Sequence, residues 1–370
     1  MTITSRNYTL VIIIPTFNEV DNVSTIVDRL HKTLKEFSWE VIFIDDDSPD
    51  GTSFKLKEIS KKYSNVRFIR RIGRRGLSSA CLEGILASKS DLIAVMDADL
   101  QHDEKLLPQM YDLINTNNKD LVIGSRYTKG GEIDSWNINR KRGSLFATFI
   151  SKKLLGIKLK DPMSGFFMIK RSIIEDIIYD LSSIGFKVLL DIIISLKRPI
   201  KIVELPYSFG VRKTGESKLD NKVIWDFLLL IIDKKIGKFL PVRFISFAII
   251  GSFGVIVHLI ILISLKIIFP ENFTFAQSSA VVTSMIFNFI LNNALTYRDQ
   301  RLTGISFFFG MVKFMFACSI GALSNVGIAS FIYFDSGNWL FSGLAGIIVG
   351  LIWNYGATSV LVWSKQGQNK

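Results

Sequence analysis

The near absence of charge from the last third of the chain limits most strongly what the chain can fold into. Residues 239–370 hold 7 of the 45 Lys and Arg residues and 3 of the 33 Asp and Glu residues. This part contains four apolar stretches of about 20 residues or more, the length at which a helix crosses a hydrocarbon core of about 30 Å. The predicted spans are residues 244–265, 273–295, 307–334 and 339–363. Soluble helices of this length normally carry a polar stripe, so a buried helical core is the weaker interpretation.

The charges beside the spans predict their orientation. Basic residues gather between the second and third spans and in the tail, namely Arg298, Arg301, Lys365 and Lys370. The short loops on the other side, around Glu271 and Asp335, have none. The positive-inside rule therefore predicts that the N-terminal domain and both termini are cytosolic. The first apolar run, residues 10–15, is too short for a signal-peptide core. We expect a multi-pass membrane protein, which in a prokaryote lies in the cell membrane.

Residues 1–219 have the pattern of a parallel sheet built from βαβ units, because β-branched runs alternate with amphipathic helical patterns. The predicted strands are residues 10–15, 40–45, 66–69, 92–97 and 121–124, and the predicted helices are residues 22–37, 52–62, 77–88 and 104–115. In an open α/β sheet, ligands bind at the edge where the strands have their carboxyl ends. Cys81 and Cys318 are too few for a disulfide scaffold, and we expect two free thiols.

Residues 220–238 form the expected connection between the two domains, residues 1–219 and 239–370. Five apolar residues lie mostly on one helical face: Val223, Phe227, Leu230, Ile231 and Ile232. Three lysines lie near the end of this helix: Lys234, Lys235 and Lys238. This pattern is typical of a helix on the membrane surface, with its apolar face in the lipid and its lysines on the head groups. A helix that packs against the protein core would have the same apolar face, so that alternative stays open.

Two acidic clusters follow predicted strands. Asp97 and Asp99 come after a buried strand, and two carboxylates at this spacing can bind one Mg²⁺ or Mn²⁺ beside a diphosphate. The same spacing is also common in solvated loops. Asp45, Asp46 and Asp47 end another strand, where three like charges repel one another unless something binds them. The net charge of +12 favours phosphate-bearing partners or an anionic membrane surface.

Other polar features have two interpretations each. Pro15–Glu19 ends the first strand before a helix and could contact a nucleotide base and ribose, or form a turn with a helix cap. Arg74–Gly76 opens a helix and could bind an anion, or be a solvated run of charge. None of the three histidines predicts a competing mechanism. His31 lies on a surface helix, His102 is expected in solvent, and His258 lies within a span, where it could bond to another helix.

Seven motifs occur in order along residues 8–238. They are Pro15–Glu19, Asp45–Thr52, Arg75–Leu77, Met96–His102, Gly124–Tyr127, Asp161–Phe166 and Gly215–Leu219. This ordered set resembles glycosyltransferase family 2, and within it the polyprenyl-phosphate (dolichol-phosphate) mannose synthases. Residues 239–365 are similar to the GtrA-like membrane domain of four helices that is fused to such enzymes.

The resemblance implies an α/β GT-A (Rossmann-like) catalytic domain followed by an all-α transmembrane domain of four helices. It also implies Mg²⁺ or Mn²⁺ as cofactor, and it assigns roles to residues that match the family's motifs. The nucleotide would be bound by Pro15, Phe17, Glu19, Asp46 and Asp97, with Arg212 and Lys218 on its phosphates. The metal would be held by Asp97, Asp99 and Gln101. The lipid phosphate would be bound by Arg126, Arg140 and Ser144, and the catalytic residues would be Asp99, Arg126 and Arg140.

The activity that the resemblance implies is that of a dolichyl-phosphate β-D-mannosyltransferase. It would move mannose from GDP-mannose to a polyprenyl or dolichyl phosphate on the cytosolic leaflet, with inversion and without a nucleic-acid partner. Transfer of glucose or an aminosugar to undecaprenyl phosphate, and translocation of the glycolipid by the membrane half, stay open as alternatives. The phosphate acceptor is already an anion and needs no strong base. Two unit charges about 4 Å apart repel by roughly 4 kcal/mol at an effective dielectric of 20, so cationic groups must offset that repulsion.

Overall fold

The computed structural model of the protein describes residues 8–128, 132–133, 159–182, 187–210, 221–237, 239–269, 273–336 and 339–363. The chain divides into two compact units, Met1–Lys234 and Lys235–Lys370, and each is described by itself.

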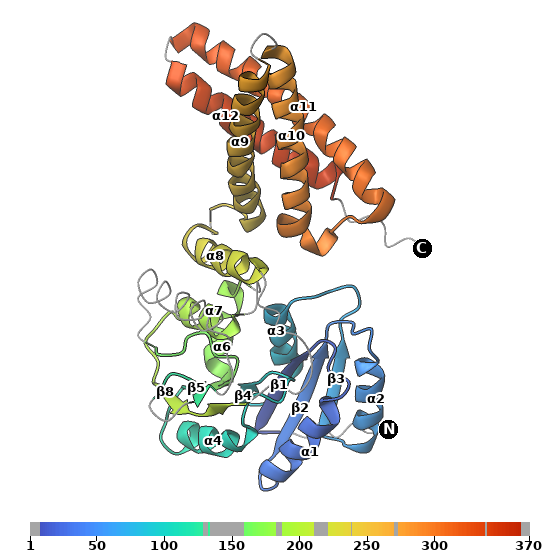
Figure 1. Ribbon diagram of the computed structural model, residues 1–370. Helices are drawn as coiled ribbons and strands as arrows, with labels where there is room; N and C mark the ends of the chain where they lie inside the picture. Colours follow the sequence, from blue (N-terminus) through green and yellow to red (C-terminus); the bar gives the residue numbers. More distant parts are fainter. Residues whose placement is uncertain are drawn as a thin grey trace. The chain divides into compact units, whose positions relative to one another are not determined.

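The first unit is built on a sheet of seven strands in the order β3-β2-β1-β4-β7-β5-β8 (Figure 1). The strands are β1 (Leu10–Thr16), β2 (Trp39–Asp45), β3 (Val66–Arg70), β4 (Leu92–Val95), β5 (Leu121–Ser125), β7 (Phe167–Lys170) and β8 (Ile202–Pro206). A second, two-stranded sheet pairs β6 (Glu132–Ile133) with β9 (Ser208–Phe209). The five predicted strands are confirmed. β7 and β8 were not predicted, and β7 runs antiparallel to both of its neighbours.

Helices cover both faces of the large sheet. Side chains alternate between the two faces along each strand, so apolar strands place apolar side chains on both faces. Leu10, Ile12 and Ile14 of β1 belong to one buried cluster, whereas Val11 and Ile13 belong to another. The first cluster is covered by α1 (Val23–Thr33), α2 (Thr52–Lys62) and α4 (Leu107–Asn115). The second is covered by α3 (Leu77–Ala87), α6 (Arg171–Ile177) and α7 (Val188–Ser195). This three-layer arrangement confirms the predicted α/β fold.

The reversed strand β7 determines which loop reaches the functional edge of the sheet. Val95 at the end of β4 pairs with Phe167 at the start of β7. The segment before β7 therefore lies at the same edge as the carboxyl ends of the parallel strands. The Gly124 N–H donates to the Phe166 carbonyl there (2.9 Å), so this segment is tied to the end of β5.

The helix α8 (Asn221–Ile236) packs against its own unit along part of the face that the sequence assigned to lipid. Phe227, Leu230 and Ile231 are buried against Met163 and Leu190. For these three side chains, the predicted insertion into lipid is wrong and the alternative of a core-packing helix is correct. The physical reason is that an apolar stripe on a helix buries itself equally well against protein or lipid.

Lys234 of α8 also differs from its prediction. Its Nζ lies 2.5 Å from Asp191 Oδ1, and both side chains are buried, at 9% and 4% exposure. It also donates to the Ser195 hydroxyl (2.7 Å). Lys234 therefore neutralises a buried carboxylate of α7 and is not placed on lipid head groups.

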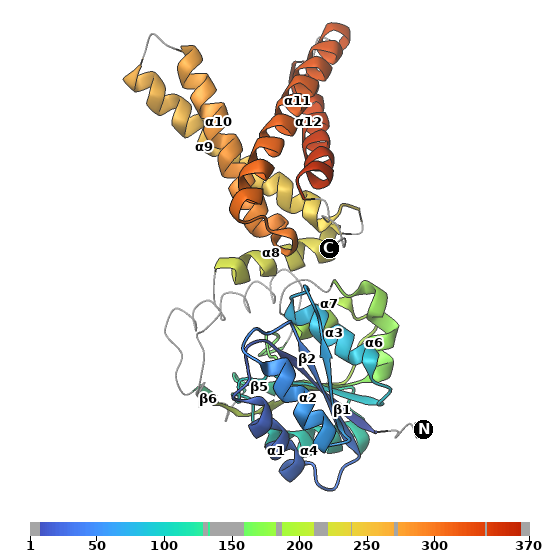
Figure 2. The same cartoon turned by 90° about the vertical axis from the view of Figure 1, so that its right-hand side faces the viewer.

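The second unit has four helices that are long and apolar enough to cross a membrane, by length and composition. They are α9 (Val242–Ile268), α10 (Phe273–Leu291), which continues as a π-helix over Asn292–Thr296, α11 (Gly304–Ser336) and α12 (Trp339–Leu361). The helices pair as two hairpins, α9 with α10 and α11 with α12 (Figure 2). Tyr297 and Trp363 stack with ring centroids 4.1 Å apart, which joins the ends of the two hairpins.

Each hairpin places an asparagine of its second helix against a glycine of its first. A Cβ atom at Gly254 would lie 2.3 Å from the Asn288 amide, and a Cβ atom at Gly321 would lie 1.9 Å from Asn354 Oδ1. The two contacts are 66 or 67 residues apart in the sequence, so the same kind of Gly–Asn contact occurs once in each hairpin. Small residues allow such close approach of helices in membranes.

Candidate active site

Polar residues gather at the carboxyl edge of the large sheet, as the sequence predicted. Pro15 lies in β1, Asp45 ends β2, Asp97 follows β4 and Arg126 follows β5. Because β1, β2, β4, β5 and β8 all point the same way, the segments after them meet at one edge. This edge is the candidate active site.

Each carboxylate of the acidic cluster at the end of β2 has its own hydrogen-bond donors. Asp45 is buried and accepts from the Ser48 N–H (3.2 Å) and the Ser48 hydroxyl (2.5 Å). Asp46 accepts from Arg71 Nη1 (2.6 Å) and the Gly76 N–H (2.7 Å). Asp47 accepts from Arg70 Nε (2.8 Å). These partners explain how three adjacent carboxylates are tolerated.

Asp46 thus has a structural task besides the nucleotide contact predicted for it. Burial raises the pKa of its carboxyl, although Arg71 and the Gly76 N–H act in the opposite direction. Arg71, whose side chain is 3% exposed, also donates to the Ser79 hydroxyl (2.6 Å) and the Gly76 carbonyl (3.1 Å). Asp46 and Arg71 together hold the loop that leads into α3.

That loop contacts the segment that follows β1. The Arg75 guanidinium lies over the Phe17 ring, 4.3 Å from its centroid. Glu19 is anchored by two bonds, its N–H to the Thr52 hydroxyl (3.0 Å) and its carboxylate from Asn22 Nδ2 (2.6 Å). Arg74 pairs with Glu83 at the surface (3.0 Å), which fits the alternative of a solvated charge for that residue.

The predicted metal ligands lie in the turn after β4. The Gln101 N–H donates to Asp99 Oδ1 (3.2 Å), across Leu100 in the left-handed conformation (φ 63°). Gln101 Nε2 donates to the Gly210 carbonyl (2.8 Å). Asp99 and Gln101 are buried, whereas the Asp97 side chain is 35% exposed. All three offer oxygen atoms, the ligand type that Mg²⁺ and Mn²⁺ prefer.

In the part of the chain that the structure describes, few other acidic or histidine side chains lie around these carboxylates. Within the described ranges, no three His, Cys, Asp or Glu side chains gather closely enough to hold a metal by themselves. A Cβ atom at Gly165 would lie 3.0 Å from Asp97 Oδ2, so glycine gives that carboxylate more room than a larger residue would.

His102 is buried, and the prediction that it lies in solvent is wrong. Its ring stacks on Phe166 with centroids 5.2 Å apart and planes at 12°. Its Nδ1 accepts from the Asp97 N–H (3.0 Å). Burial lowers the pKa of His102 to about 4, so the ring is neutral near pH 7. The turn folds back on itself after Leu100, and this reversal carries the residue inward.

Arg126 is held by Asp161 through three hydrogen bonds. Its Nε and Nη2 donate to the two carboxylate oxygens (2.8 Å each), and its N–H donates to Oδ2 (3.1 Å). The side chains are 9% and 0% exposed. This ion pair raises the pKa of Arg126 further above its usual range. The Nε–Nη2 edge faces Asp161, so the predicted bidentate grip on a lipid phosphate cannot use that edge, and direct contact stays a prediction.

Tyr207 was missed because β8, which it follows, was not predicted. It is buried, and its ring lies 5.7 Å from that of Phe166 and 6.0 Å from that of His102. Burial raises the pKa of its hydroxyl well above the usual value. Tyr207 and Phe166 fill the space beside Gly124, where a Cβ atom would lie 2.7 Å from the Phe166 ring. The tyrosine therefore packs between the metal motif and Arg126 without an ionic role.

Four predicted site residues lie outside the described residues: Arg140, Ser144, Arg212 and Lys218. Their roles stay predictions.

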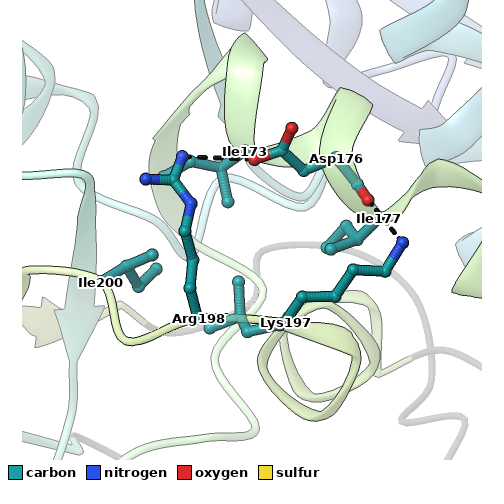
Figure 3. Close-up of a pocket in the computed structure, with 7 residues that line it drawn as sticks. Ile173, Asp176, Ile177, Lys197, Arg198 and Ile200 are labelled. Carbon is teal, nitrogen blue, oxygen red and sulfur yellow. Dashed lines mark hydrogen bonds and ion pairs between the residues drawn. The ribbon is translucent and has the colours of Figure 1, made fainter.

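A cavity of about 130 Å³ lies away from this edge, between α6 and the segment before β8 (Figure 3). Its floor is apolar, and its two cationic residues contact Asp176. Lys197 Nζ donates to the Asp176 carbonyl (2.9 Å) and Arg198 Nη2 to its carboxylate (3.2 Å). The cavity lies at the opposite edge of the sheet, where β8 begins, so it is not part of the candidate active site.

Two protein-family models match the chain. "Glycosyl transferase family 2" matches residues 11–178, and "GtrA/DPMS, transmembrane domain" matches residues 246–363. The two matches fall on the two units of the structure.

One relative matches nearly the whole chain, and another matches about three fifths of it. A dolichol-phosphate mannosyltransferase from Pyrococcus furiosus is 36% identical over 358 residues, which are 95% of this chain and 99% of the relative. A dolichol-phosphate mannosyltransferase from Saccharomyces cerevisiae is 34% identical over 237 residues, 62% of this chain and 87% of the relative. Among solved structures, glucosyl-3-phosphoglycerate synthase from Mycobacterium tuberculosis in complex with Mn²⁺, UDP and glucosyl-3-phosphoglycerate has a TM-score of 0.44 and 18% identity, covering 61% of this chain and 80% of that chain.

Proposed function

Because the chain belongs to the dolichol-phosphate mannosyltransferases of glycosyltransferase family 2, we propose that it transfers mannose from GDP-mannose to a polyprenyl phosphate at the cytosolic face of a membrane. The observation that carries this proposal is the 36% identity to a dolichol-phosphate mannosyltransferase over 99% of that protein's length. The match includes the membrane half as well as the catalytic half.

The donor nucleotide binds at the edge beside β1 and β2. Phe17 and Arg75 offer a flat surface on which a base can stack, and the anchored Glu19 offers a carboxylate to the base or ribose. The pair of Asp46 and Arg71 keeps the Arg75 loop in place. Arg212 and Lys218 are proposed to contact the donor phosphates from the segment before α8.

Asp97, Asp99 and Gln101 are the residues that would hold Mg²⁺ or Mn²⁺. When bound, the ion neutralises the diphosphate and stabilises it as a leaving group. The chain's own part is to present oxygen atoms in a fixed turn: the Gln101 N–H holds Asp99, and Gly210 holds the Gln101 amide. Gly165 keeps the space at Asp97 open for the donor.

The acceptor approaches from the side of β5. A phosphate oxygen attacks the anomeric carbon from the face opposite the diphosphate, which inverts the configuration. The acceptor and the diphosphate are both anions, so the positive charge of Arg126 lowers the repulsion between them. Asp161 holds this guanidinium in place. Arg140 and Ser144 are proposed to bind the acceptor phosphate directly.

The membrane half is proposed to anchor the enzyme where its acceptor lies. The catalytic unit and both termini are cytosolic in this proposal, since the flanking basic residues favour that side. Tethering raises the local concentration of enzyme near a lipid acceptor without any new contact.

The experiment is to incubate the purified protein with labelled GDP-mannose, UDP-glucose or UDP-N-acetylglucosamine, and a polyprenyl phosphate. The proposal predicts a labelled lipid with GDP-mannose only, and its loss on adding EDTA. Labelled lipid from a UDP-sugar alone would refute GDP-mannose as the donor. Loss of labelled GDP-mannose without a labelled lipid would indicate hydrolysis of the donor.

A further inference from the structure

Both ring nitrogens of His102 face Asp97. Nδ1 accepts the Asp97 N–H (3.0 Å), and Nε2 lies 3.6 Å from Asp97 Oδ2. A ring nitrogen that accepts a hydrogen bond carries no proton, and an imidazole keeps at least one proton on its two nitrogens. The proton is therefore on Nε2, the atom that faces the carboxylate.

The ring has little freedom to turn away. Phe166 stacks on one face of it, and the rings of Tyr207 and Phe209 contact it edge-on, with centroids 6.0 and 5.8 Å away. The His102 side chain is only 2% exposed. A donor that is fixed by packing can orient a neighbouring group without losing much conformational entropy itself.

We propose that His102 is a positioning residue that turns the Asp97 carboxylate toward the metal and the donor diphosphate. This inference rests on the proposed function, which places Asp97 at that site. The distance of 3.6 Å is longer than a hydrogen bond, so the contact is a dipole–charge attraction that limits the directions in which Oδ2 can point. Gly165 borders the same oxygen from another side. Groups that hydrogen-bond to a metal ligand typically contribute about 10- to 100-fold to metal affinity, and this longer contact should lie at the lower end of that range, about tenfold.

Two variants separate this role from support of the turn. His102→Asn places an oxygen where Nδ1 was and can keep the bond to the Asp97 N–H, but it has no atom in the place of Nε2. His102→Phe loses both polar atoms and keeps the stack on Phe166. If His102 only supports the turn, His102→Asn behaves like the wild type. If it positions the carboxylate, both variants lose metal affinity.

The matched control is His31→Phe. Like His102, His31 contacts a backbone group through Nδ1, here the Val27 carbonyl (2.9 Å), and packs against aromatic rings, those of Trp39 and Tyr63. It lies on α1, outside the proposed machinery, so its loss should leave metal binding unchanged.

The first measurement is Mn²⁺ binding to the full-length protein in detergent, followed by the electron paramagnetic resonance of free Mn²⁺. We expect dissociation constants about tenfold higher for His102→Asn and His102→Phe than for wild type and His31→Phe. Wild-type affinity in His102→Asn would overturn the inference, even if His102→Phe does not fold. Asp99→Ala distinguishes a failure of the inference about His102 from a failure of the proposed metal site. If Asp99→Ala loses Mn²⁺ and the His102 variants keep it, only the role of His102 fails. If wild type itself does not bind Mn²⁺, the proposed metal site fails.

The second measurement needs no metal. The chain has three histidines, so ¹⁵N labelling of histidine gives three sets of ring signals, and the His102 set is the one missing from His102→Asn. We expect its proton on Nε2 and an unprotonated Nδ1. A proton on Nδ1 would overturn the inference.

Discussion

Replacing Asp161 by Asn tests whether the buried pair with Arg126 holds the acceptor side of the site. The change removes the negative charge but keeps a side chain of the same shape. The charge of Arg126, whose side chain is 9% exposed, then loses the carboxylate that compensates it. Removing one partner of a buried ion pair typically costs about 3–5 kcal/mol, because the other charge stays buried and uncompensated.

The magnitude can be worked out for this site. Asp161 accepts three hydrogen bonds from Arg126, at 2.8, 2.8 and 3.1 Å. An amide has one oxygen, so Asn can keep only part of this set, and it places an N–H near the guanidinium. We therefore expect a loss of about 3–5 kcal/mol of unfolding free energy. For a unit of this size, each kcal/mol lowers the melting temperature by about 2–4 °C, which gives a decrease of roughly 6–20 °C.

The assay is thermal unfolding of the purified full-length protein, followed by intrinsic fluorescence at neutral pH. The matched control is Asp176→Asn, which breaks an exposed pair with Arg198 (3.2 Å; 66% and 54% exposed) and should cost at most about 1 kcal/mol. If Asp161→Asn melts no lower than Asp176→Asn, the pair does not stabilise the site and the reasoning is refuted.

Four further outcomes are expected. Asp99→Ala should abolish transfer with little change in melting temperature. Adding EDTA to the wild type should abolish transfer as well. Near wild-type turnover in either case would rule out the metal assignment. Arg126→Lys keeps the charge but not the fork, so transfer should fall by tenfold or more while GDP affinity stays within about twofold; an equal fall in GDP affinity would move Arg126 to the donor site. A chain ending at Lys238 should still transfer mannose to a short, soluble polyprenyl phosphate, though less efficiently to lipid in vesicles; complete inactivity of a folded, GDP-binding truncation would mean that the spans build part of the site. Gly254→Ala should lower the melting temperature of the membrane unit, because the new methyl group collides with Asn288, whereas Gly251→Ala, with no atom within 4 Å of the new Cβ, should not.

Long elements could be predicted from the sequence because their periodicity is local. The five parallel strands and the helices between them lie within a few residues of their predicted bounds, and all four apolar helices are present. The family match and the mixed sheet confirm the expected GT-A fold. By contrast, β7 and β8 were not predicted, although at four and five residues they are no shorter than the predicted β4 and β5. Their place in the sheet depends on pairing with distant segments, as β7 does with β4 and β5.

The errors at the site have the same origin. A histidine beside charged residues has no sequence signal that distinguishes burial from solvent, and His102 became buried because Phe166 and Tyr207 from distant segments cover it. Asp161 was recognised within a motif, but its pairing with Arg126 depends on the reversal of β7, which local patterns do not contain. The face of α8 was ambiguous because lipid and protein both accept an apolar stripe.

The position of β7 in the sheet also sets the order in which the enzyme can assemble during synthesis. β1, β2, β3 and β4 pair with one another and need only residues 8–95. β5 is connected to these strands through β7, so it cannot join the sheet until residues 167–170 have been made. Pairing between segments so far apart in the sequence is slow. Until then β4 has an unpaired edge, and such edges promote association between chains. The nascent chain is therefore most prone to aggregate after the strands beside Asp46 have paired. This period ends when β7 has paired and Arg126 contacts Asp161.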